Sequence, residues 1–153
     1  MTRARPKLML LVERFKPEHL GTFEVERYQF ANGAPLDAEY GEFLANNGDA
    51  FTVRRPDGSV IAVLGLLHQW EGRALAWAIL AQDSGDAMLP LTRAIAHYLK
   101  TCDYRRIEAY LDTEFPQGIR WARALGFVCE TPMPMPGFYP NGNPAFLYAR
   151  VQL

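Results

Sequence analysis

The chain has 153 residues, 49% of them hydrophobic and 22% charged, a composition typical of one globular domain. Sixteen Lys and Arg stand against 17 Asp and Glu, so the net charge is −1 and there is no basic excess to bind a nucleic acid. The longest apolar runs, residues 60–67 and 74–81, fall short of the roughly 20 residues that cross a bilayer. Residues 8–12 are likewise too short for the apolar part of a signal peptide. We therefore expect a single cytoplasmic domain over residues 1–153, with neither a nucleic acid nor a membrane as partner.

Cysteine and proline usage narrows the expectation further. Cys102 and Cys129 are too few for a disulfide framework or a zinc site, so we expect no metal centre. Five of the 11 prolines stand close together near the C-terminus: Pro132, Pro134, Pro136, Pro140 and Pro144. We expect them to stiffen a loop between the last two strands, as either a wall of the substrate site or a cap on the sheet edge.

Three elements are predicted before residue 50. They are an apolar strand at 8–15, a short helix starting near Pro17, and a second short helix that carries Leu36, Tyr40, Phe43 and Leu44 at helical spacing. The break at 32–35, Asn-Gly-Ala-Pro, separates the two helices.

Strands dominate the middle of the chain. Apolar and β-branched residues predict strands at 51–55 and 59–67, joined by the turn residues Arg55-Pro56-Asp57-Gly58. Residues 74–81 form the fourth expected strand, in which large residues alternate with alanines. One face of this strand is therefore bulky and the other thin, which suits either a bound ligand or a closely packed helix.

The second half alternates helices with strands. A helix is predicted over 88–102, a strand over 106–112, a helix from Pro116 to the capping residue Gly126, and strands over 127–130 and 145–151. Hairpins early and strand–helix–strand units late imply an α/β (α+β) domain: a mixed sheet with helices on both faces.

Two motifs in this order of elements resemble the GNAT superfamily of N-acetyltransferases. The first is Gln82-Asp83-Ser84-Gly85-Asp86-Ala87, which matches the pyrophosphate-loop pattern of that family. A turn that enters a helix N-terminus presents backbone N–H groups to an anion. The second runs without a gap from Ile107-Glu108-Ala109 to Leu125-Gly126-Phe127 and resembles the fifth strand and fourth helix of the family. The ending, from Gly137-Phe138-Tyr139, is most similar to the divergent GNAT-like proteins of tailed bacteriophages.

The resemblance implies a fold and a reaction. The fold is a mixed sheet of about seven strands with about four helices, splayed between strands four and five, and many members pair through their C-terminal strands, which allows a homodimer. Acetyl-CoA would lie in the splay, with its diphosphate on residues 82–87 and its thioester carbonyl polarised by a backbone N–H near Leu80. The expected reaction is direct attack by an amine, of a small molecule or a protein, on acetyl-CoA in a ternary complex.

The sequence departs from the family at several positions. The tyrosine that commonly protonates the CoA thiolate aligns with Ala122, and the asparagine that often contacts the cofactor aligns with Phe115. No Glu stands on the fourth strand, and Asp83 and Asp86 put negative charge where a diphosphate would bind. Pro90 stands where it could displace the start of the long helix. The alternative is therefore a catalytically silent GNAT-like binding or structural protein, for example a phage component.

The remaining catalytic candidates are few. Asp112, at the end of the fifth strand, is the candidate proton acceptor, although a role in capping the next turn is the simpler interpretation. Tyr139, beside the proline-rich loop, is a second candidate that could reach a substrate. His68, near the end of the third strand, could act as a base, although a structural role beside Trp70 is the simpler interpretation. His19 and His97 have no partner at ligand spacing and are interpreted as surface or packing residues.

Overall fold

A computed structural model of the chain describes residues 8–26 and 36–153. Its strands form one mixed sheet in the order β1-β2-β3-β4-β5-β7-β6. The strands are β1 (Leu11–Arg14), β2 (Gly48–Arg54), β3 (Val60–Trp70), β4 (Arg73–Leu80), β5 (Arg106–Asp112), β6 (Val128–Cys129) and β7 (Ala145–Val151). Every neighbouring pair is antiparallel except β4 and β5, which are parallel.

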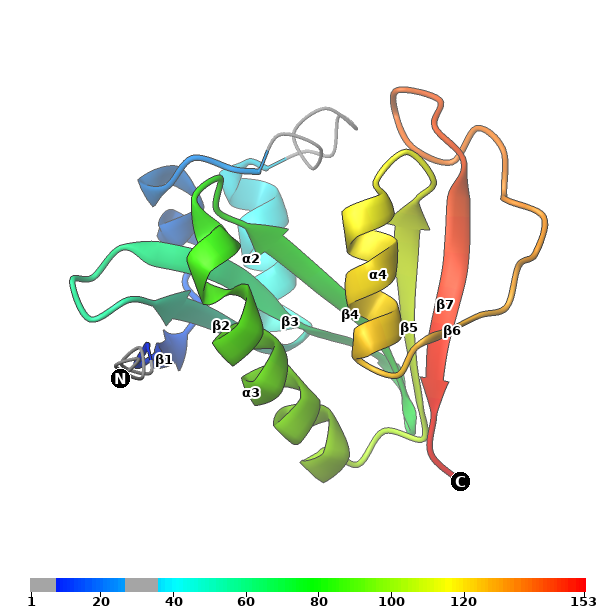
Figure 1. Ribbon diagram of the computed structural model, residues 1–153, viewed down its shortest axis with the longest axis horizontal. Helices are drawn as coiled ribbons and strands as arrows, with labels where there is room; N and C mark the ends of the chain where they lie inside the picture. The colour runs from blue at the N-terminus through cyan, green and yellow to red at the C-terminus, as the bar shows by residue number, and fades with distance from the viewer. Residues whose placement is uncertain (1–7, 27–35) are drawn as a thin grey trace, which may run out of the picture.

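Helices cover both faces of the sheet (Figure 1). They are the 3₁₀ helices η1 (Pro17–Thr22) and η2 (Ser84–Ala87) and the α-helices α2 (Ala38–Asn46), α3 (Met88–Thr101) and α4 (Pro116–Ala124). η1 and α2 pack on one face, and α3 and α4 lie on the other. The predicted mixed sheet with helices on both faces is confirmed. No helix within the described ranges combines the length and the hydropathy that a membrane crossing requires.

The sheet is splayed between its two parallel strands. β4 and β5 pair only where Arg73–Leu75 meets Arg106–Glu108. Beyond that point β4 stays paired with β3 and β5 stays paired with β7, so the two strands diverge toward their C-terminal ends, as Figure 1 shows. The predicted splay is confirmed, and it leaves the later part of β4 without β5 as its neighbour.

Several predicted boundaries are wrong by a few residues. The first strand is only Leu11–Arg14 rather than 8–15, because pairing with β2 ends at Phe51. β3 runs on to Trp70 because the turn is tight, with Gly72 at a φ of 83°. β6 has two residues instead of the four expected over 127–130, since only Val128 and Cys129 pair with β7. The predicted break at 32–35 lies outside the described residues.

A charged cluster lies at the closed end of the splay. The carboxylate of Glu108 is buried and accepts hydrogen bonds from Arg73 Nε at 2.6 Å and from Arg106 Nε at 2.7 Å. Arg106 also pairs with Glu130, which follows β6. The pKa of Glu108 is lowered from 4.5 to about 2, and its hydrogen bonds with the Arg73 guanidinium are the largest cause. The last pairing of β4 with β5 is therefore reinforced by side chains from both strands.

Glu108→Gln should lower the free energy of unfolding by about 2 kcal/mol at neutral pH, because two guanidinium groups lose their charged acceptor. Since the pKa of Glu108 is depressed on folding, its contribution is complete above pH 4.5 and is lost as the pH falls toward 2. Urea denaturation should show that the free energies of unfolding of wild type and Glu108→Gln differ less at about pH 3 than at about pH 7. Glu130→Gln changes a more exposed partner of Arg106 and should lower the free energy of unfolding by less than Glu108→Gln does. An equal loss for both variants would contradict the assignment.

Candidate functional site

A cavity of about 440 Å³ lies where the sheet splays, between α3, α4 and the strands. Ala76 and Ala78 of β4 line it, whereas Ala74 is fully buried among core residues that include Leu99 and Ile107. The thin face of β4 therefore has both features expected of it, space for a ligand and close packing of a helix. One alanine allows close packing of a helix, and two leave open space.

The described residues that line the cavity are mostly apolar, and one of them is charged. Among the described residues that line it, Asp112 is the one with an ionisable carboxylate. The segments 1–7 and 27–35 contain no Asp or Glu, so no acidic residue of the chain is left out of this comparison. The cavity thus offers a single negative charge in otherwise apolar surroundings.

Asp112 is buried at the C-terminal end of β5. Its Oδ1 accepts the backbone N–H of Glu114 at 2.9 Å, and both of its oxygens lie within 3.2 Å of Asn143 Nδ2. The predicted capping of the following turn is therefore present. Asp112 also lines the cavity, and its role as a proton acceptor stays a prediction.

Tyr139 lines the same cavity from the loop between β6 and β7. Its backbone N–H donates to Asn143 O at 3.1 Å, and its carbonyl accepts from Gly142, so a tight turn fixes the residue. Burial is the largest cause that raises the pKa of Tyr139, and the nearby Asp112 carboxylate adds to it. The phenol therefore keeps its proton at neutral pH and acts as a hydrogen-bond donor.

Residues 82–87 form the turn that leads into α3. Ser84 and Ala87 are buried, and a Cβ placed at Gly85 would meet no atom within 4 Å. Space beside Gly85 is consistent with close approach of a ligand, and the φ of this residue is not in the left-handed region. Pro90 is the third residue of α3, a position at which a backbone N–H would have no partner within the helix. Proline is therefore tolerated there, and α3 begins at Met88 as predicted.

Arg55, from the turn after β2, places a positive charge against residues 82–87, which contain no Lys or Arg. Its Nη2 donates to Asp83 O at 2.7 Å and to Asp86 Oδ1 at 2.6 Å, and its side chain is only 13% exposed. This ion pair lowers the pKa of Asp86. Sequence reasoning placed Arg55 in a turn and missed this contact, because the two segments are 28 residues apart along the chain.

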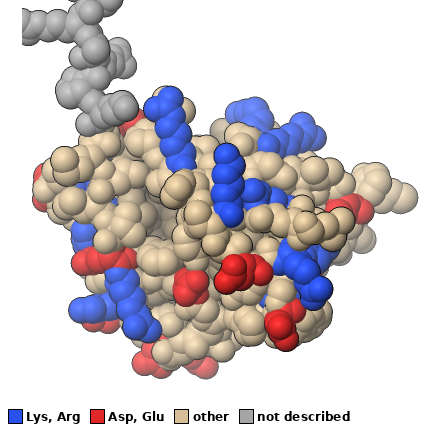
Figure 2. Space-filling model, turned by 90° about the horizontal axis from the view of Figure 1, so that it is seen from below, with Lys and Arg blue, Asp and Glu red and all other residues tan. Residues whose placement is uncertain are grey.

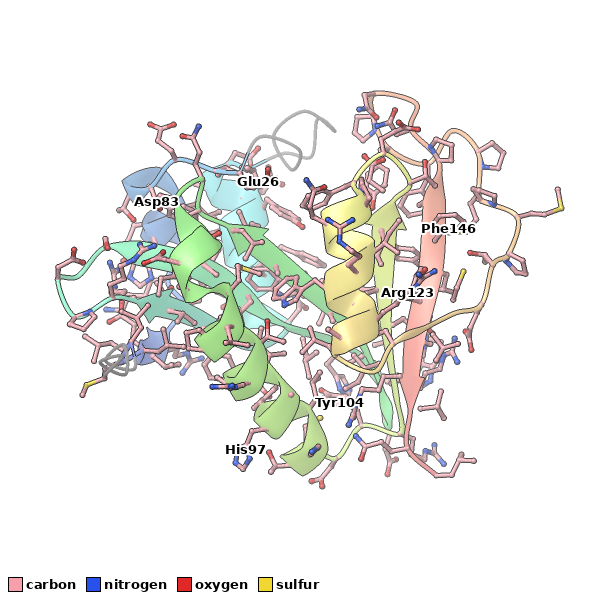
Figure 3. The ribbon with its side chains drawn as sticks, viewed as in Figure 1. Glu26, Asp83, His97, Tyr104, Arg123 and Phe146 are labelled. Carbon is pink, nitrogen blue, oxygen red and sulfur yellow. The ribbon has the colours of Figure 1, made fainter. Side chains whose placement is uncertain are left out.

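The end of β4 has a further neighbour. Leu80 O accepts the N–H of Glu26 at 2.8 Å, and Gln82 N–H donates to Glu24 O at 2.8 Å. Figure 3 shows Glu26 and Asp83 at the same end of the molecule. The segment 24–26 thus runs beside the end of β4, next to the backbone that the resemblance assigns to the thioester. The N–H near Leu80 stays a prediction.

The two positions that depart from the family pattern lie in the cavity wall. Ala122 and Phe115 both line it, and the Phe115 ring packs on Gly118 of α4. Beside Ala122, Trp121 Nε1 donates to Thr92 Oγ1 at 2.8 Å and links α4 to α3. A hydrogen bond between side chains therefore helps to set the separation of these helices.

Trp77 is a cavity residue that sequence reasoning did not select. It lies on β4 with its ring edge-on to Phe15, at 5.9 Å between centroids. Its Nε1–H is buried with no hydrogen-bond partner, and it is the one such side-chain atom in the part of the chain that the structure describes. Leaving a buried donor unpaired costs about 1–3 kcal/mol, so a ligand oxygen in the cavity would gain from meeting it. The alternation of β4 signalled a bulky face but gave no sign of an unpaired donor.

The three histidines lie at separate places in the fold. His19 is buried, with Nδ1 at 2.7 Å from Thr52 Oγ1, and His68 Nδ1 lies 3.1 Å from the hydroxyl of Tyr104 at the surface. His97 is exposed on the side of α3 that points away from α4 (Figure 3). Within the described ranges, no group of three or more His, Cys, Asp or Glu could hold a metal ion.

Solved structures resemble this chain, although no family model and no curated protein matches it. A chimera of the spermidine N-acetyltransferase SpeG from Vibrio cholerae superposes with a TM-score of 0.65 at 17% identity, over 93% of this chain and 95% of that chain. The spermidine N-acetyltransferase from Vibrio cholerae in complex with CoA and spermine gives a TM-score of 0.65 at 16% identity, over 94% and 95%. Likeness at this identity establishes the fold, so the chain has the GNAT fold of the N-acetyltransferases. These structures do not bear on the narrower resemblance to bacteriophage proteins.

The unpaired donor of Trp77 can be tested against a paired one. Trp77→Phe and Trp121→Phe remove the same ring volume, but only Trp121 loses a hydrogen bond. We expect Trp121→Phe to lower the free energy of unfolding by about 1 kcal/mol more than Trp77→Phe, measured by urea denaturation. Equal losses would show that the two N–H groups are in equivalent environments.

Proposed function

We propose that this protein is an acyl-CoA-dependent N-acyltransferase that moves an acetyl group from acetyl-CoA to an amine. The observation that carries the proposal is the splay: β4 and β5 part after three paired residues, and an apolar cavity opens between them. The turn at 82–87, with space beside Gly85 and the helix α3 behind it, lies next to the end of β4. This arrangement suits an extended thioester whose diphosphate rests at a helix N-terminus.

The residues of the chain fit acetyl-CoA in three respects and oppose it in one. The apolar cavity accepts a pantetheine arm, the turn at 82–87 has open space beside Gly85 for a diphosphate, and Arg55 adds a cation nearby. Against this, Asp83 and Asp86 leave the loop with a net negative charge even after Arg55 is counted. We therefore expect weaker binding of the diphosphate than a basic loop would give.

The proposed reaction is direct attack in a ternary complex. An ammonium must first lose a proton to expose its lone pair, and we assign the acceptance of that proton to Asp112. The amine nitrogen then bonds to the thioester carbon and the C–S bond breaks, with its electron pair going to the sulfur. The nitrogen releases a second proton, which the departing thiolate takes up, while the Tyr139 hydroxyl, kept protonated by its raised pKa, donates a hydrogen bond to that thiolate. The proton on Asp112 passes to solvent, so one proton is released in all.

A binding or structural protein without catalysis is the second candidate. The contact of Glu26 N–H with Leu80 O favours it, because the chain's own backbone already uses a hydrogen-bonding position at the end of β4. The presence of Ala122 instead of a tyrosine favours it too. The mixed charge on the face seen in Figure 2, where neither sign forms a continuous patch, supports neither candidate over the other.

The placement of the diphosphate can be tested at Gly85. Acetyl-CoA at about 100 times its Kd should stabilise the wild type by about 2.7 kcal/mol, which thermal melting detects. Gly85→Glu, which adds a side chain and a negative charge in open space beside the loop, should abolish this gain. His97→Glu on the outer side of α3 introduces the same residue and should keep it. A full gain in Gly85→Glu would disprove this placement, and no gain in the wild type at millimolar acetyl-CoA would disprove the enzyme.

The charge of the loop can be tested at Arg55. Arg55→Ala should weaken CoA binding about tenfold, because Asp83 and Asp86 then face the diphosphate without a counter-charge. Asp86→Asn should strengthen binding for the same reason. Isothermal titration calorimetry with CoA measures both. Arg54→Ala is the matched control, since Arg54 bonds Glu13 and Gly58 O rather than the loop, and a loss of affinity in that variant would contradict the assignment.

A further inference from the structure

Aromatic side chains gather around the single carboxylate of the cavity. Trp77 of β4, Tyr110 of β5 and Tyr139 of the β6–β7 loop line the same space as Asp112. Phe138 lies behind them, with its ring centroid 4.8 Å from that of Tyr110 and 5.0 Å from that of Tyr139. We call these four aromatic residues, together with Asp112, the aromatic subsite.

The strands explain why these groups share one side of the sheet. Tyr110 and Asp112 alternate along β5 with Ala109 and Leu111, which pack with the core on the α4 side. Trp77 packs instead with the core beneath η1 and α2. The aromatic subsite therefore lies at the splay on the face opposite α4, where a second substrate could approach a thioester from the other side. Tyr110 is 37% exposed, so this end of the cavity is open to solvent.

The carboxylate of Asp112 retains hydrogen-bonding capacity. Glu114 N–H and Asn143 Nδ2 share its Oδ1, while Oδ2 has Asn143 Nδ2 alone. A carboxylate oxygen can accept more than one hydrogen bond. A buried negative charge without a cation is costly, and an ammonium group beside it would offset that cost.

The surrounding rings favour the same kind of ligand. The faces of Trp and Tyr rings attract a cation within about 6 Å, and their large apolar surfaces pack against an apolar or aromatic body. The cavity offers no second carboxylate, so an amine with several positive charges would find a carboxylate partner there for only one of them. The chemistry of the site thus selects for one charge and an apolar remainder.

We infer that the aromatic subsite binds a primary amine with one positive charge and an apolar, aromatic-sized body, whose ammonium group lies at Asp112. That the bound amine is acetylated rests on the proposed function, whereas its binding does not. The named substrates of the structures with the same fold, spermidine and spermine, carry several charges and are disfavoured here.

Calorimetric titration of the wild type with three probes tests the inference directly. 2-Phenylethylamine should bind at least tenfold more tightly than 2-phenylethanol, which has the same body without the charge, and at least tenfold more tightly than spermidine. The titration is made with and without CoA, so amine binding is read separately from acetyl transfer. Absence of phenylethylamine binding, or equal or tighter binding of either other probe, would overturn the inference. Failure of the proposed function would instead appear as an absence of acetyl-CoA binding.

Variants locate the charge that is responsible. Asp112→Asn should remove the preference for 2-phenylethylamine over 2-phenylethanol while leaving the affinity for the alcohol unchanged. Glu114→Gln removes an exposed carboxylate two residues away, outside the cavity, and should keep the preference. A preference that survives in a folded Asp112→Asn protein would overturn the inference. If the Asp112→Asn protein does not fold, the titration of the wild type with the three probes still tests the inference.

Discussion

The short parallel pairing of β4 with β5 is the constraint on which the rest of the site depends. Only three register pairs join the strands, and Glu108 is held there between Arg73 and Arg106. Each strand otherwise follows its own antiparallel neighbour, β3 or β7, over most of its length. Had the parallel pairing continued to Leu80 and Asp112, the edge of β4 would be bonded to β5 and the space between them would be closed.

A shared core joins the two parts of the sheet at the closed end of the splay. On the face covered by α3 and α4, Leu66 of β3 and Ala74 of β4 pack with Ile107 of β5 and Tyr148 of β7, whereas the core beneath η1 and α2 draws on β2, β3 and β4 among the main strands. α3 touches both parts, and the hydrogen bond that Trp121 Nε1 donates to Thr92 Oγ1 ties it to α4. The walls of the cavity are therefore held together by this core and by the contact between the two helices.

The sequence predicted what local patterns determine. Periodicity and turn residues were sufficient for the types of the elements, and the thin face of β4 was visible from its alternating alanines. Contacts over long distances along the chain were not visible. Arg55 meets Asp86, and Asp112 meets Asn143, across 31 residues in each case. Periodicity carries no information about such pairs, and the resemblance carried none because they are not part of its motifs. The unpaired N–H of Trp77 was equally hidden, since only the packing around a donor decides whether it finds a partner.

The cluster of prolines near the C-terminus links the sheet edge to the cavity. Glu130 N–H donates to Leu147 O, but Pro132, the next residue in line to donate to β7, has no N–H, and only the isolated pair of Met135 with Ala145 follows. A regular strand therefore cannot continue beyond β6, and the chain leaves the sheet. It turns at Gly137, where φ is 64°, and places Tyr139 in the cavity wall. The loop thus runs along the edge of β7 and also contributes to the cavity wall, and its expected role as a wall of the substrate site stays a prediction.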